Sequence, residues 1–380
     1  MKKILIINTA YKEKGGEDTN IVDEINFLKD NYEVEYLEYK NSDNIKASDI
    51  LAFFTSSNIK SNKILKSKIN EFKPDLIYVH NTWYRANLGI FKILREGNAK
   101  VFIKLHNFRF FCTRTLFVSR HLKNSEVCHM CNLNKGKSFF NKYFKESYIK
   151  SIFVIIYGRR YFQILKGYGF NLLVMTEFQK NFLKSLEFNP KRIKIYKNPT
   201  LLNQHAHYKV NSDYLVYAGR ITEEKGISEL LEAWRKSKVK DLTLKIIGDG
   251  ELLKLHSANR KNHNVEFLGE LNHKKTLEII KNSRGVLTAT KMYEAQPRLL
   301  CEASISGVPS LFPEFGGMSE FFPKEYKFKF EQFNYEDLSE KIKMFNDKRL
   351  LEETSKSLIN YSKILFDKET NKKNFEEVIY

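Results

Sequence analysis

The sequence predicts an α/β protein with two consecutive domains, each built on a parallel β-sheet. Short apolar runs rich in β-branched and aromatic residues recur along the chain, and segments with helical periodicity separate them. This alternation is typical of βαβ units. The chain is also long enough, at 380 residues with an ordinary hydrophobic fraction of 42%, to bury two cores. We therefore expect two Rossmann-like domains that face a cleft.

The expected strands fall into two sets, one on each side of Pro199. The first set comprises Lys3–Asn8, Glu33–Tyr39, Asp75–His80, Lys100–His106 and Leu172–Thr176. The second set comprises Tyr214–Ala218, Leu242–Ile247, Val265–Leu268, Gly285–Ala289 and Val308–Phe312. Apolar residues at helical spacing predict helices at Ile227–Trp234 and Leu338–Phe345.

The domain boundary is expected at the proline between the two sets of strands. Pro199 interrupts any continuing element, so we place a hinge near Lys197–Thr200. The predicted N-terminal domain covers residues 1–197, and the predicted C-terminal domain covers residues 198–362. Residues 363–380 are expected to form a C-terminal helix that can cross back to the first domain.

Charge and apolar content limit the class of protein. The formal net charge of +19 favours an anionic partner, which could be nucleic acid, a lipid surface or a phosphorylated substrate. The N-terminal apolar run ends at Asn8, too early for a signal peptide. No apolar stretch approaches the roughly 20 residues of a membrane span, and four cysteines do not make a disulfide scaffold. We expect a cytoplasmic protein.

The segment after the expected strand Tyr214–Ala218 has the composition of a phosphate site. Gly219 permits a tight turn. Gly226 precedes an expected helix, whose first amides and positive dipole end suit an anion. Arg220 would add a forked donor and Lys225 a point charge. A solvated loop with ordinary surface charges is the alternative.

Two glutamates eight positions apart suit a ligand with several hydroxyl groups. Glu294 lies in the loop that follows the expected strand Gly285–Ala289. Pro297 suits a first helical position, which puts Glu302 in the second turn. Carboxylates accept hydrogen bonds from ribose or sugar hydroxyls, and open α/β folds bind ligands at this edge. An exposed helix after an acidic loop is one alternative. A glycosidase carboxylate pair is another, which the nearby Arg and Lys disfavour.

Further glycines and one histidine are candidates at strand ends. Gly316 and Gly317 follow the last expected strand, and Gly16 is the second of two adjacent glycines after the first strand. Either pair could let the backbone approach a ligand, or could form a plain turn. His106 ends an expected strand, so it could point into the cleft or could be a structural histidine.

Cysteines and histidines gather between positions 112 and 131. Cys112, Cys128 and Cys131 form a C-x15-C-x2-C group, with His121 and His129 close by. A C-x-x-C pair with one further cysteine can hold zinc, but no fourth ligand stands out. Reduced, unliganded thiols in a loop are the favoured interpretation, so no metal site is expected.

The segment Ser138–Tyr168 interleaves aromatic and basic side chains. One interpretation is a helix with an apolar core face and a basic solvent face. Another is an interfacial helix pair that rests on anionic lipid, and a third is nucleic-acid binding through stacked aromatics. The basic residues that would contact a membrane surface are Lys142, Lys145, Lys150, Arg159 and Arg160.

Taken in order, these elements resemble the family-4 retaining glycosyltransferases, which have the GT-B fold. The resemblance covers nearly the whole chain and rests on four elements: a Gly-Gly loop, a strand-end histidine, G-R…K-G and E-x7-E. They contain Gly15 and Gly16, His106, Gly219 with Arg220, Lys225 with Gly226, and Glu294 with Glu302. The sequence LHNFRFFC followed by CHMC also resembles a block in a polysaccharide-assembly subset of the family.

The resemblance implies a role for each residue. Arg220 and Lys225 would neutralise the donor diphosphate in place of a metal ion. Glu302 would bind the ribose hydroxyls and Glu294 the hydroxyls of the donor sugar. His106 would lie beside that sugar, and it joins Arg220, Lys225 and Glu294 as a candidate catalytic residue. The other residues implied to bind the donor are Gly16, Gly219, Gln296, Pro297, Gly316 and Gly317.

One loop departs from the family's pattern. The usual E-G-F-P reads here Glu294-Ala295-Gln296-Pro297, so Gln296 can alter which sugar fits. The identity of the donor sugar is therefore open.

The favoured function is transfer of a sugar, with retention of anomeric configuration, from a UDP- or GDP-sugar to a growing lipid-linked oligosaccharide of O-antigen or capsule type. The enzyme would be peripheral at the anionic inner face of the cytoplasmic membrane. A soluble glycosyltransferase acting on a small molecule or glucan is the alternative enzyme. A basic nucleic-acid-binding protein would leave Glu294 and Glu302 unexplained, so nucleic acid is not an expected partner. No cofactor is expected, since Gly248-x-Gly250 lacks the third glycine of a dinucleotide fingerprint.

Overall fold

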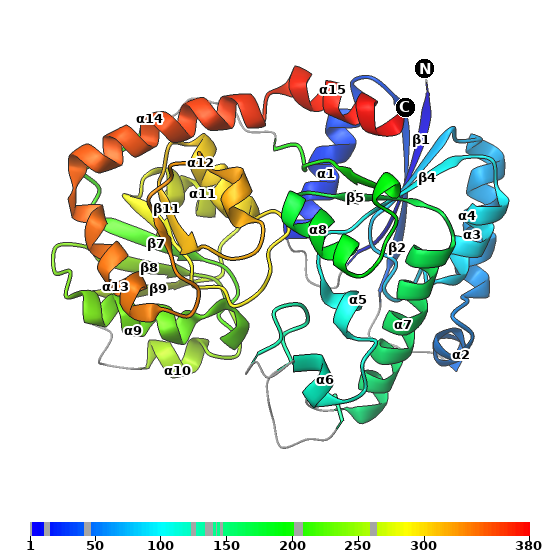
Figure 1. Ribbon diagram of the computed structural model, residues 1–380, viewed down its shortest axis with the longest axis horizontal. Coiled ribbons are helices and arrows are strands. Elements are labelled where there is room, and N and C mark those ends of the chain that lie inside the picture. Colours follow the sequence, from blue (N-terminus) through cyan, green and yellow to red (C-terminus); the bar gives the residue numbers. More distant parts are fainter. Residues whose placement is uncertain are drawn as a thin grey trace. The chain divides into compact units, whose positions relative to one another are not determined.

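The protein folds into two compact units. The computed structural model describes residues 2–10, 16–41, 47–122, 127–133, 140–141, 143–144, 147–200, 208–258 and 264–380. Unit 1 comprises Met1–Leu201 together with Glu377–Tyr380, and unit 2 comprises Leu202–Glu376. Within the described residues, each unit contains one six-stranded sheet in which neighbouring strands run parallel (Figure 1). The predicted α/β class with two parallel-sheet domains is confirmed.

The sheet of unit 1 has the strand order β2-β1-β3-β4-β5-β6. Its strands are β1 (Lys3–Ala10), β2 (Glu33–Lys40), β3 (Leu76–Val79), β4 (Lys100–Lys104), β5 (Asn171–Val174) and β6 (Ile193–Ile195). Ile4 and the next three residues of β1 have no exposed surface. Such a continuous apolar run is expected of a parallel strand that is covered on both faces.

Several helices of unit 1 begin after a polar residue whose side chain caps the helix. They are α1 (Gly16–Lys29), α2 (Ala47–Thr55), α3 (Ile59–Phe72), α4 (Gly89–Glu96), α5 (Arg109–Cys112), α6 (Val118–Leu122), α7 (Tyr148–Gly167) and α8 (Glu177–Ser185). The Ser147 side chain accepts a hydrogen bond from an amide in the first turn of α7, and Thr176 does the same for α8. In the described residues no helix is both long and apolar enough to cross a membrane.

The sheet of unit 2 has the order β12-β11-β10-β7-β8-β9. Its strands are β7 (Tyr214–Ala218), β8 (Thr243–Ile247), β9 (Val265–Gly269), β10 (Gly285–Leu287), β11 (Ser310–Pro313) and β12 (Lys329–Phe330). Its helices are α9 (Ile227–Ser237), α10 (Leu253–Ser257), α11 (His273–Lys281), α12 (Arg298–Ile305), α13 (Tyr335–Lys343) and α14 (Lys348–Leu365), and α15 (Lys368–Ile379) ends the chain. Figure 1 shows α9 and α13 on one side of this sheet and α11 and α12 on the other.

Both sheets reverse their strand order beside their first strand. In unit 1, β1 lies between β2 and β3; in unit 2, β7 lies between β8 and β10. Open parallel sheets bind ligands at the carboxyl ends of the strands at such a switch point. The loops that follow β7 and β10 are therefore the positions in unit 2 where a ligand site is expected.

All ten strands expected from the sequence are present, with ends shifted by a few residues. The sequence missed β6 and β12, which contain only three and two residues. Runs this short carry no recognisable alternation or apolar pattern. The two expected helices correspond to α9 and α13.

Candidate functional site

The predicted phosphate element lies at the end of β7 and packs against the end of β10. Gly226 connects a short 3-10 turn (Glu223–Lys225) to α9 and has a φ angle of 67°, in the left-handed region that favours glycine. A Cβ atom at Gly226 would lie 2.0 Å from the carbonyl oxygen of Ala289. A side chain is therefore excluded at this position, and the two loops approach each other backbone to backbone.

Lys225 and Glu294, 69 positions apart in the sequence, contact each other. The Nζ atom of Lys225 lies 2.5 Å from Oε1 of Glu294, and Thr290 Oγ1 donates to the same oxygen at 3.4 Å. Both side chains of the ion pair are partly exposed. The fold thus joins the G-R…K-G and E-x7-E elements at the carboxyl ends of β7 and β10.

Arg220 presents its guanidinium at the surface of unit 2. Its side chain is 68% exposed, and one of its terminal nitrogens lies 3.1 Å from Oε1 of Glu224, whose side chain is buried. The Tyr217 hydroxyl donates to the Arg220 carbonyl at 2.6 Å, which fixes the backbone from which the side chain extends. Arg220 is therefore anchored at its base and accessible at its charged end.

Glu302 is buried completely and contacts two nitrogen-bearing side chains that were not predicted from the sequence. The Nε atom of Arg298 lies 2.8 Å from its Oε1. Nε2 of His273, at the start of α11, lies 3.0 Å from the same oxygen. The spacing of Arg298 and Glu302, four positions apart on one helix face, could have indicated the first pair. Only the fold brings His273 to Glu302.

The remaining donor-binding candidates of unit 2 lie in neighbouring loops at the same sheet edge. Pro297 was expected at the first helical position but is the N-cap of α12, whose first residue is Arg298, and Gln296 precedes it. Gly316 has a φ angle of 65°, and Gly317 begins a 3-10 turn (Met318–Phe321) after β11. The rings of Tyr293 and Phe315 stack with centroids 4.7 Å apart between the β10 and β11 loops.

The Gly248-x-Gly250 pair has a packing role. A Cβ at Gly248 would lie 2.0 Å from the Gly219 carbonyl oxygen, and one at Gly250 would lie 2.4 Å from the Ile221 carbonyl oxygen. The glycines allow the loop after β8 to pack directly on the loop after β7.

Unit 1 contains a buried charged network around the predicted histidine that the sequence analysis did not indicate. Glu24 on α1 accepts hydrogen bonds from Lys104 Nζ at 2.9 Å and from the Tyr78 hydroxyl at 2.7 Å. His80 Nδ1 lies 2.7 Å from His106 Nε2, and their rings stack with centroids 5.0 Å apart. These residues come from α1 and from the ends of β3 and β4.

The two imidazoles are kept neutral by their surroundings. Burial, assisted by the positive charge of Lys104, lowers the pKa of His106 to about 3. Burial also lowers the pKa of His80 well below its usual value.

A small cavity of about 30 Å³ adjoins both rings and is also lined by Glu17 and Tyr161. Gly16, the first described residue of α1, precedes Glu17, and Gly15 lies outside the described residues.

The basic residues predicted to face a membrane are placed unequally. Lys142 and Lys145 lie outside the described residues. Lys150 is exposed in the first turn of α7. Arg159 Nε donates to the Arg114 carbonyl at 2.7 Å. Arg160 donates to the backbone and side chain at the end of α2. Both arginines thus bind other parts of unit 1.

The three predicted cysteines are brought together in unit 1, where His121 joins them. His129, the other nearby histidine, is not part of this group. The sequence placed both histidines close to the cysteines without distinguishing them.

Known families and structures agree with this architecture. Residues 201–364 match the family model described as glycosyl transferases group 1. The crystal structure of Anabaena Alr3699/HepE in complex with UDP and glucose has a TM-score of 0.68 to this chain, with 13% identity over 100% of this chain and 99% of that one. The predicted resemblance to glycosyltransferases and the GT-B fold are confirmed, whereas the assignment to family 4 stays a prediction. Retention of configuration and the individual site residues stay predictions.

Two relatives by sequence come from bacteria. The amylovoran biosynthesis glycosyltransferase AmsD of Erwinia amylovora is 28% identical over 153 residues, which cover 38% of this chain and 43% of AmsD. Protein CapJ of Staphylococcus aureus is 26% identical over 196 residues, which cover 46% of this chain and 49% of CapJ. The matched region thus spans less than half of either relative.

Proposed function

We propose that this protein is a glycosyltransferase that moves a sugar from a nucleotide-sugar donor to a growing polysaccharide or its lipid-linked precursor. The observation that carries the proposal is the contact between Lys225 and Glu294 beside the switch point of unit 2. It joins a cation suited to phosphate with a carboxylate suited to sugar hydroxyls. The match of residues 201–364 to a glycosyltransferase family supports the same reaction.

In the proposed mechanism, charge on the protein stabilises the leaving nucleoside diphosphate. Arg220 and Lys225 hold their charged ends at the loop after β7, where they would receive the diphosphate oxygens. Each cation is paired with a carboxylate, so the diphosphate would compete with Glu224 and Glu294 for the two cations. Two preorganised cations would supply the charge stabilisation that a metal ion gives in other transferases.

The carboxylates are proposed to recognise hydroxyl groups. Glu294 would accept hydrogen bonds from the donor sugar, and Glu302 would accept them from the ribose. Because Glu302 is buried, and His273 is its more exposed partner, ribose binding would require the His273 side chain to share or leave this carboxylate. Gly316 and Gly317 would bring backbone amides close to the donor. His106 is proposed as a further catalytic residue, and the sugar is proposed to be transferred with retention.

The donor is proposed to be a UDP- or GDP-sugar and the acceptor a bacterial surface polysaccharide. The structural relative HepE was crystallised with UDP and glucose, and AmsD is named for amylovoran biosynthesis. A soluble enzyme acting on a small-molecule or glucan acceptor is the alternative.

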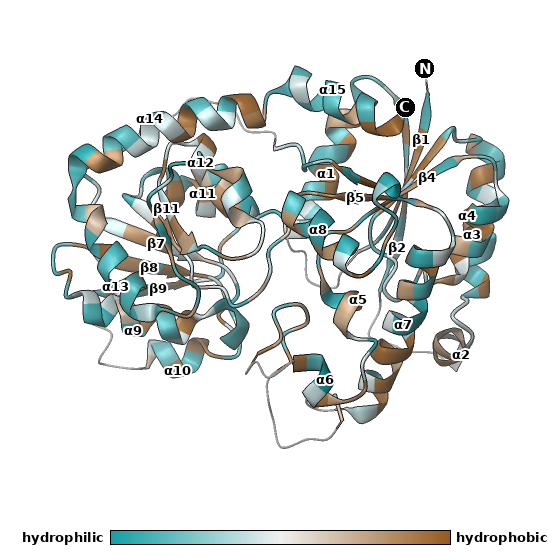
Figure 2. Ribbon diagram, viewed as in Figure 1, coloured by the Kyte–Doolittle hydropathy of each residue, from teal (hydrophilic) through white to brown (hydrophobic). Residues whose placement is uncertain are grey.

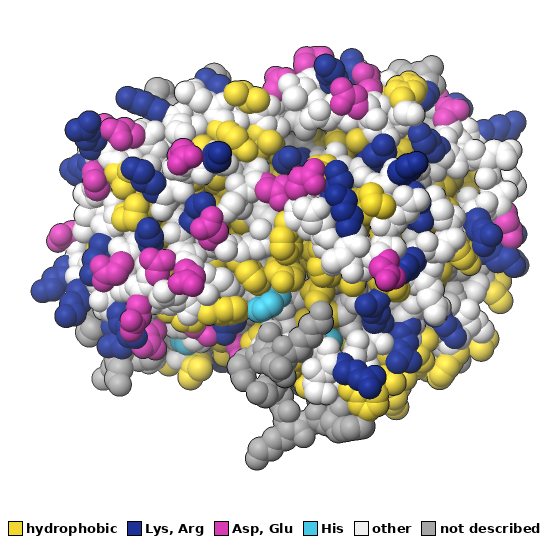
Figure 3. All heavy atoms as spheres, in the orientation of Figure 1, with side chains coloured by type: hydrophobic (Ala, Val, Ile, Leu, Met, Phe, Trp, Pro, Cys, Tyr) yellow, Lys and Arg dark blue, Asp and Glu magenta, His cyan; other side chains and the backbone are white. Residues whose placement is uncertain are grey.

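Association with the cytoplasmic face of a membrane is part of the proposal, and an apolar surface on unit 1 supports it. Figure 2 shows hydrophobic residues along α2 and part of α7, and Figure 3 shows Lys and Arg beside hydrophobic side chains on this part of unit 1. The rings of Phe53 and Phe153 stack with centroids 4.9 Å apart and fix α2 against α7. Exposed apolar side chains of the two helices are Ile50, Leu51, Phe54, Tyr148, Ile149 and Ile152. Next to them, Lys150 is exposed. This combination suits insertion at an anionic lipid surface.

A binding panel followed by a transfer assay tests the proposed function. UDP-, GDP- and dTDP-sugars would be added separately, and one class should raise the melting temperature, because a ligand that binds only the folded protein stabilises it. Glu302→Gln should lose this shift, whereas Glu294→Gln should keep most of it and lose turnover. Glu278→Gln, an exposed substitution on α11, is the matched control. A protein that responds to none of the nucleotide sugars, or an unchanged shift in Glu302→Gln, would contradict the assignments.

A further inference from the structure

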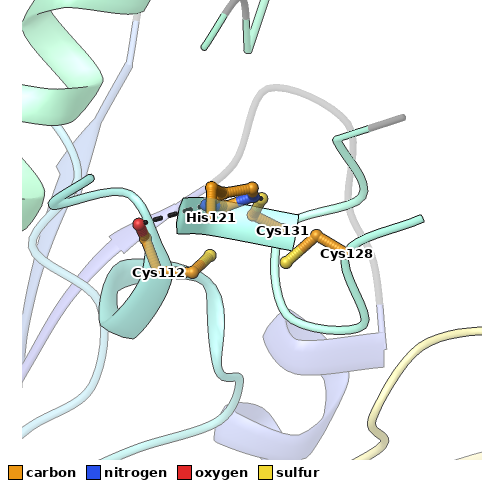
Figure 4. Close-up of side chains that lie close together, drawn as sticks. All are labelled: Cys112, His121, Cys128 and Cys131. Carbon is orange, nitrogen blue, oxygen red and sulfur yellow. Dashed lines mark hydrogen bonds between the residues drawn. The ribbon is translucent and has the colours of Figure 1, made fainter. Parts of the chain in front are cut away.

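Four potential metal ligands converge in the connection between β4 and α7. Cys112, His121, Cys128 and Cys131 each offer one donor atom, and these atoms all lie within 4.8 Å of one another. Three of the residues are buried and Cys131 is partly buried. Figure 4 shows the side chains pointing toward one another from α5, from α6 and from the turn that contains the C-x-x-C pair. All four cysteines of the chain are free thiols.

The C-x-x-C turn is folded around one of these sulfur atoms. The Met130 amide donates to Cys128 Sγ at 3.4 Å, and the Asn132 amide donates to the Cys128 carbonyl at 3.0 Å. The Cys128 amide in turn donates to the Leu133 carbonyl at 2.9 Å. Asn132 has a φ angle of 70°, which lets the chain reverse after the second cysteine. An N–H donor at sulfur favours the thiolate, the form that binds metals.

The His121 ring is oriented as a ligand. Its Nε2 atom lies 2.9 Å from Cys131 Sγ, within the group of sulfurs. Its Nδ1 atom lies 3.3 Å from the Cys112 carbonyl oxygen, which can accept a hydrogen bond from the Nδ1–H group (dashed line in Figure 4). Metal-binding histidines commonly donate their second ring N–H to such an oxygen, which fixes the tautomer and leaves the other nitrogen for the metal.

The donor set and its dimensions fit zinc. Three thiolates and one imidazole are a known combination in closed, tetrahedral structural zinc sites. With Zn–S bonds of about 2.3 Å and Zn–N bonds of about 2.0 Å, tetrahedral donors lie roughly 3.5 Å apart. The contacts in this group, from 2.9 Å to at most 4.8 Å, bracket that value. Sulfur ligands disfavour magnesium and calcium, which bind oxygen.

Among the described residues, a small apolar cluster packs around the cysteines. Residues 105–147 connect β4 to α7. Connections this long are uncommon in compact domains and usually have a functional or structural role. The buried members of this cluster are Cys112, Leu122 and Cys128. The partly buried residues that pack against them are Val118, Met130, Cys131 and Leu133. A group this small buries little apolar area, and a bound metal can add stability to such a cluster.

We propose that Cys112, His121, Cys128 and Cys131 bind one structural zinc ion. Binding transfers the thiol protons to solvent, so that three thiolates and a neutral imidazole surround Zn²⁺. All four positions of a tetrahedron are then filled by protein, which leaves none for substrate. Because Cys112 follows His106 by six residues, the ion would fix the segment that leaves the carboxyl end of β4.

Metal analysis of the purified protein tests the proposal directly. The 380-residue chain, expressed with added zinc and purified under reducing conditions without chelator, should contain about one zinc per chain. Exchange with cobalt should give thiolate-to-cobalt charge-transfer absorption and the visible bands of a tetrahedral site. Removal of zinc with a strong chelator should lower the melting temperature, and added zinc should restore it.

Matched variants identify the ligands. His121→Gln and Cys131→Ser should lose most of the zinc and the cobalt spectrum. His129→Gln, which changes a residue inside the C-x-x-C turn but outside the four-donor group, should keep both, as should Cys301→Ser in unit 2. If the ligand variants do not fold, the metal content and cobalt spectrum of the wild-type protein still decide. A reduced wild-type chain without zinc or cobalt uptake, a site filled with iron, or full zinc content in His121→Gln would overturn the proposal.

Discussion

At the scale of single residues, the unit 2 site pairs each predicted cation with a carboxylate. Lys225 contacts Glu294, and Arg220 contacts the buried Glu224. These pairs hold the cationic side chains in place before a ligand arrives, and they keep unpaired charge out of the loop. In the proposed mechanism, an incoming diphosphate would carry more negative charge than either carboxylate and would displace both from the cations.

Because Arg220 and Lys225 are proposed to stabilise the leaving diphosphate, replacing either one should lower the rate of sugar transfer. Arg220→Ala and Lys225→Ala should each slow transfer by about 10²–10³, the scale for the loss of one preorganised charge-stabilising group. Initial rates with the donor identified by binding provide the measurement. Lys236→Ala, a surface lysine of α9, is the control and should leave the rate unchanged. Rates should also be equal with and without added Mg²⁺ or Mn²⁺, and a strict need for either ion would refute the role of the two cations.

The two neutral histidines of unit 1 predict a pH dependence of stability. In the folded protein the pKa of His106 is lowered to about 3 and that of His80 is lowered as well, whereas both would titrate near 6.5 when unfolded. Below pH 6.5 the unfolded state therefore binds more protons, and the free energy of unfolding falls as the pH falls toward 3. Each histidine contributes at most about 1.4 kcal/mol per pH unit. Above pH 6.5 neither contributes a slope.

Urea unfolding at several pH values checks this expectation. The chain has two tryptophans, Trp83 in unit 1 and Trp234 in unit 2, so a Trp234→Phe background lets fluorescence report unit 1. His80→Gln should reduce the slope below pH 6.5. Tyr78→Phe removes a hydrogen bond to Glu24 without removing a group that titrates in this range, so it should lower stability equally at each pH. Identical slopes in wild type and His80→Gln would show that this histidine is not held neutral.

The limits of sequence reasoning are clearest at this scale. Glu302 was selected for its distance from Glu294 along the chain, but its partner His273 comes from a different helix. Glu24 and Lys104 are 80 positions apart and meet only because α1 packs beside the end of β4. Periodicity and motif spacing describe positions within one element, and they carry no information about such contacts.

At the scale of elements, the strands were readable because burial on both faces of a parallel sheet selects continuous apolar runs. β6 and β12 are too short to show one. The glycine-rich loops could be located from the sequence, yet their role could not. Gly226 and Gly248 proved to be required for the close approach of neighbouring loops, a property of packing rather than of the local sequence.

Gly226 and Gly269 form a matched pair that separates backbone strain from steric overlap. Both have left-handed φ angles, 67° and 69°, but a Cβ at Gly269 would meet nothing within 4 Å, whereas one at Gly226 would overlap the Ala289 carbonyl. Gly269→Ala should therefore cost about 1–2 kcal/mol. Gly226→Ala should cost clearly more and should weaken nucleotide binding, because α9 must shift. Urea unfolding followed by Trp234 fluorescence in a Trp83→Phe background measures both, and equal losses would refute the steric argument.

At the scale of the whole molecule, the net charge of +19 is large, but not every basic side chain is available to an external partner. Many lysines and arginines pair with nearby carboxylates, and Arg159 and Arg160 bind backbone oxygens of unit 1. Charge alone therefore does not define a membrane surface. The distinguishing feature is the coincidence of exposed apolar side chains on α2 and α7 with the exposed Lys150 in the first turn of α7.

Two sets of substitutions separate the contributions to membrane binding. Each basic side chain near an anionic surface contributes about 1 kcal/mol, which salt screens, whereas an inserted apolar side chain contributes a term that salt does not remove. Lys142, Lys145 and Lys150 replaced by Gln should reduce sedimentation with anionic vesicles at low salt only. Leu51→Ser with Ile149→Ser should reduce it at every salt concentration.

Wild-type protein should accordingly sediment with anionic liposomes at low salt, bind weakly to neutral ones, and detach in part as salt rises. Leu255→Ser, at an equally exposed apolar position on α10 of unit 2, should behave as wild type, and all variants should keep their response to nucleotide sugar. Equal partitioning to neutral and anionic vesicles would reject the electrostatic contribution. If the protein sediments with neither vesicle type, the exposed face of α7 contacts only solvent. A soluble acceptor would then be favoured over a lipid-linked one.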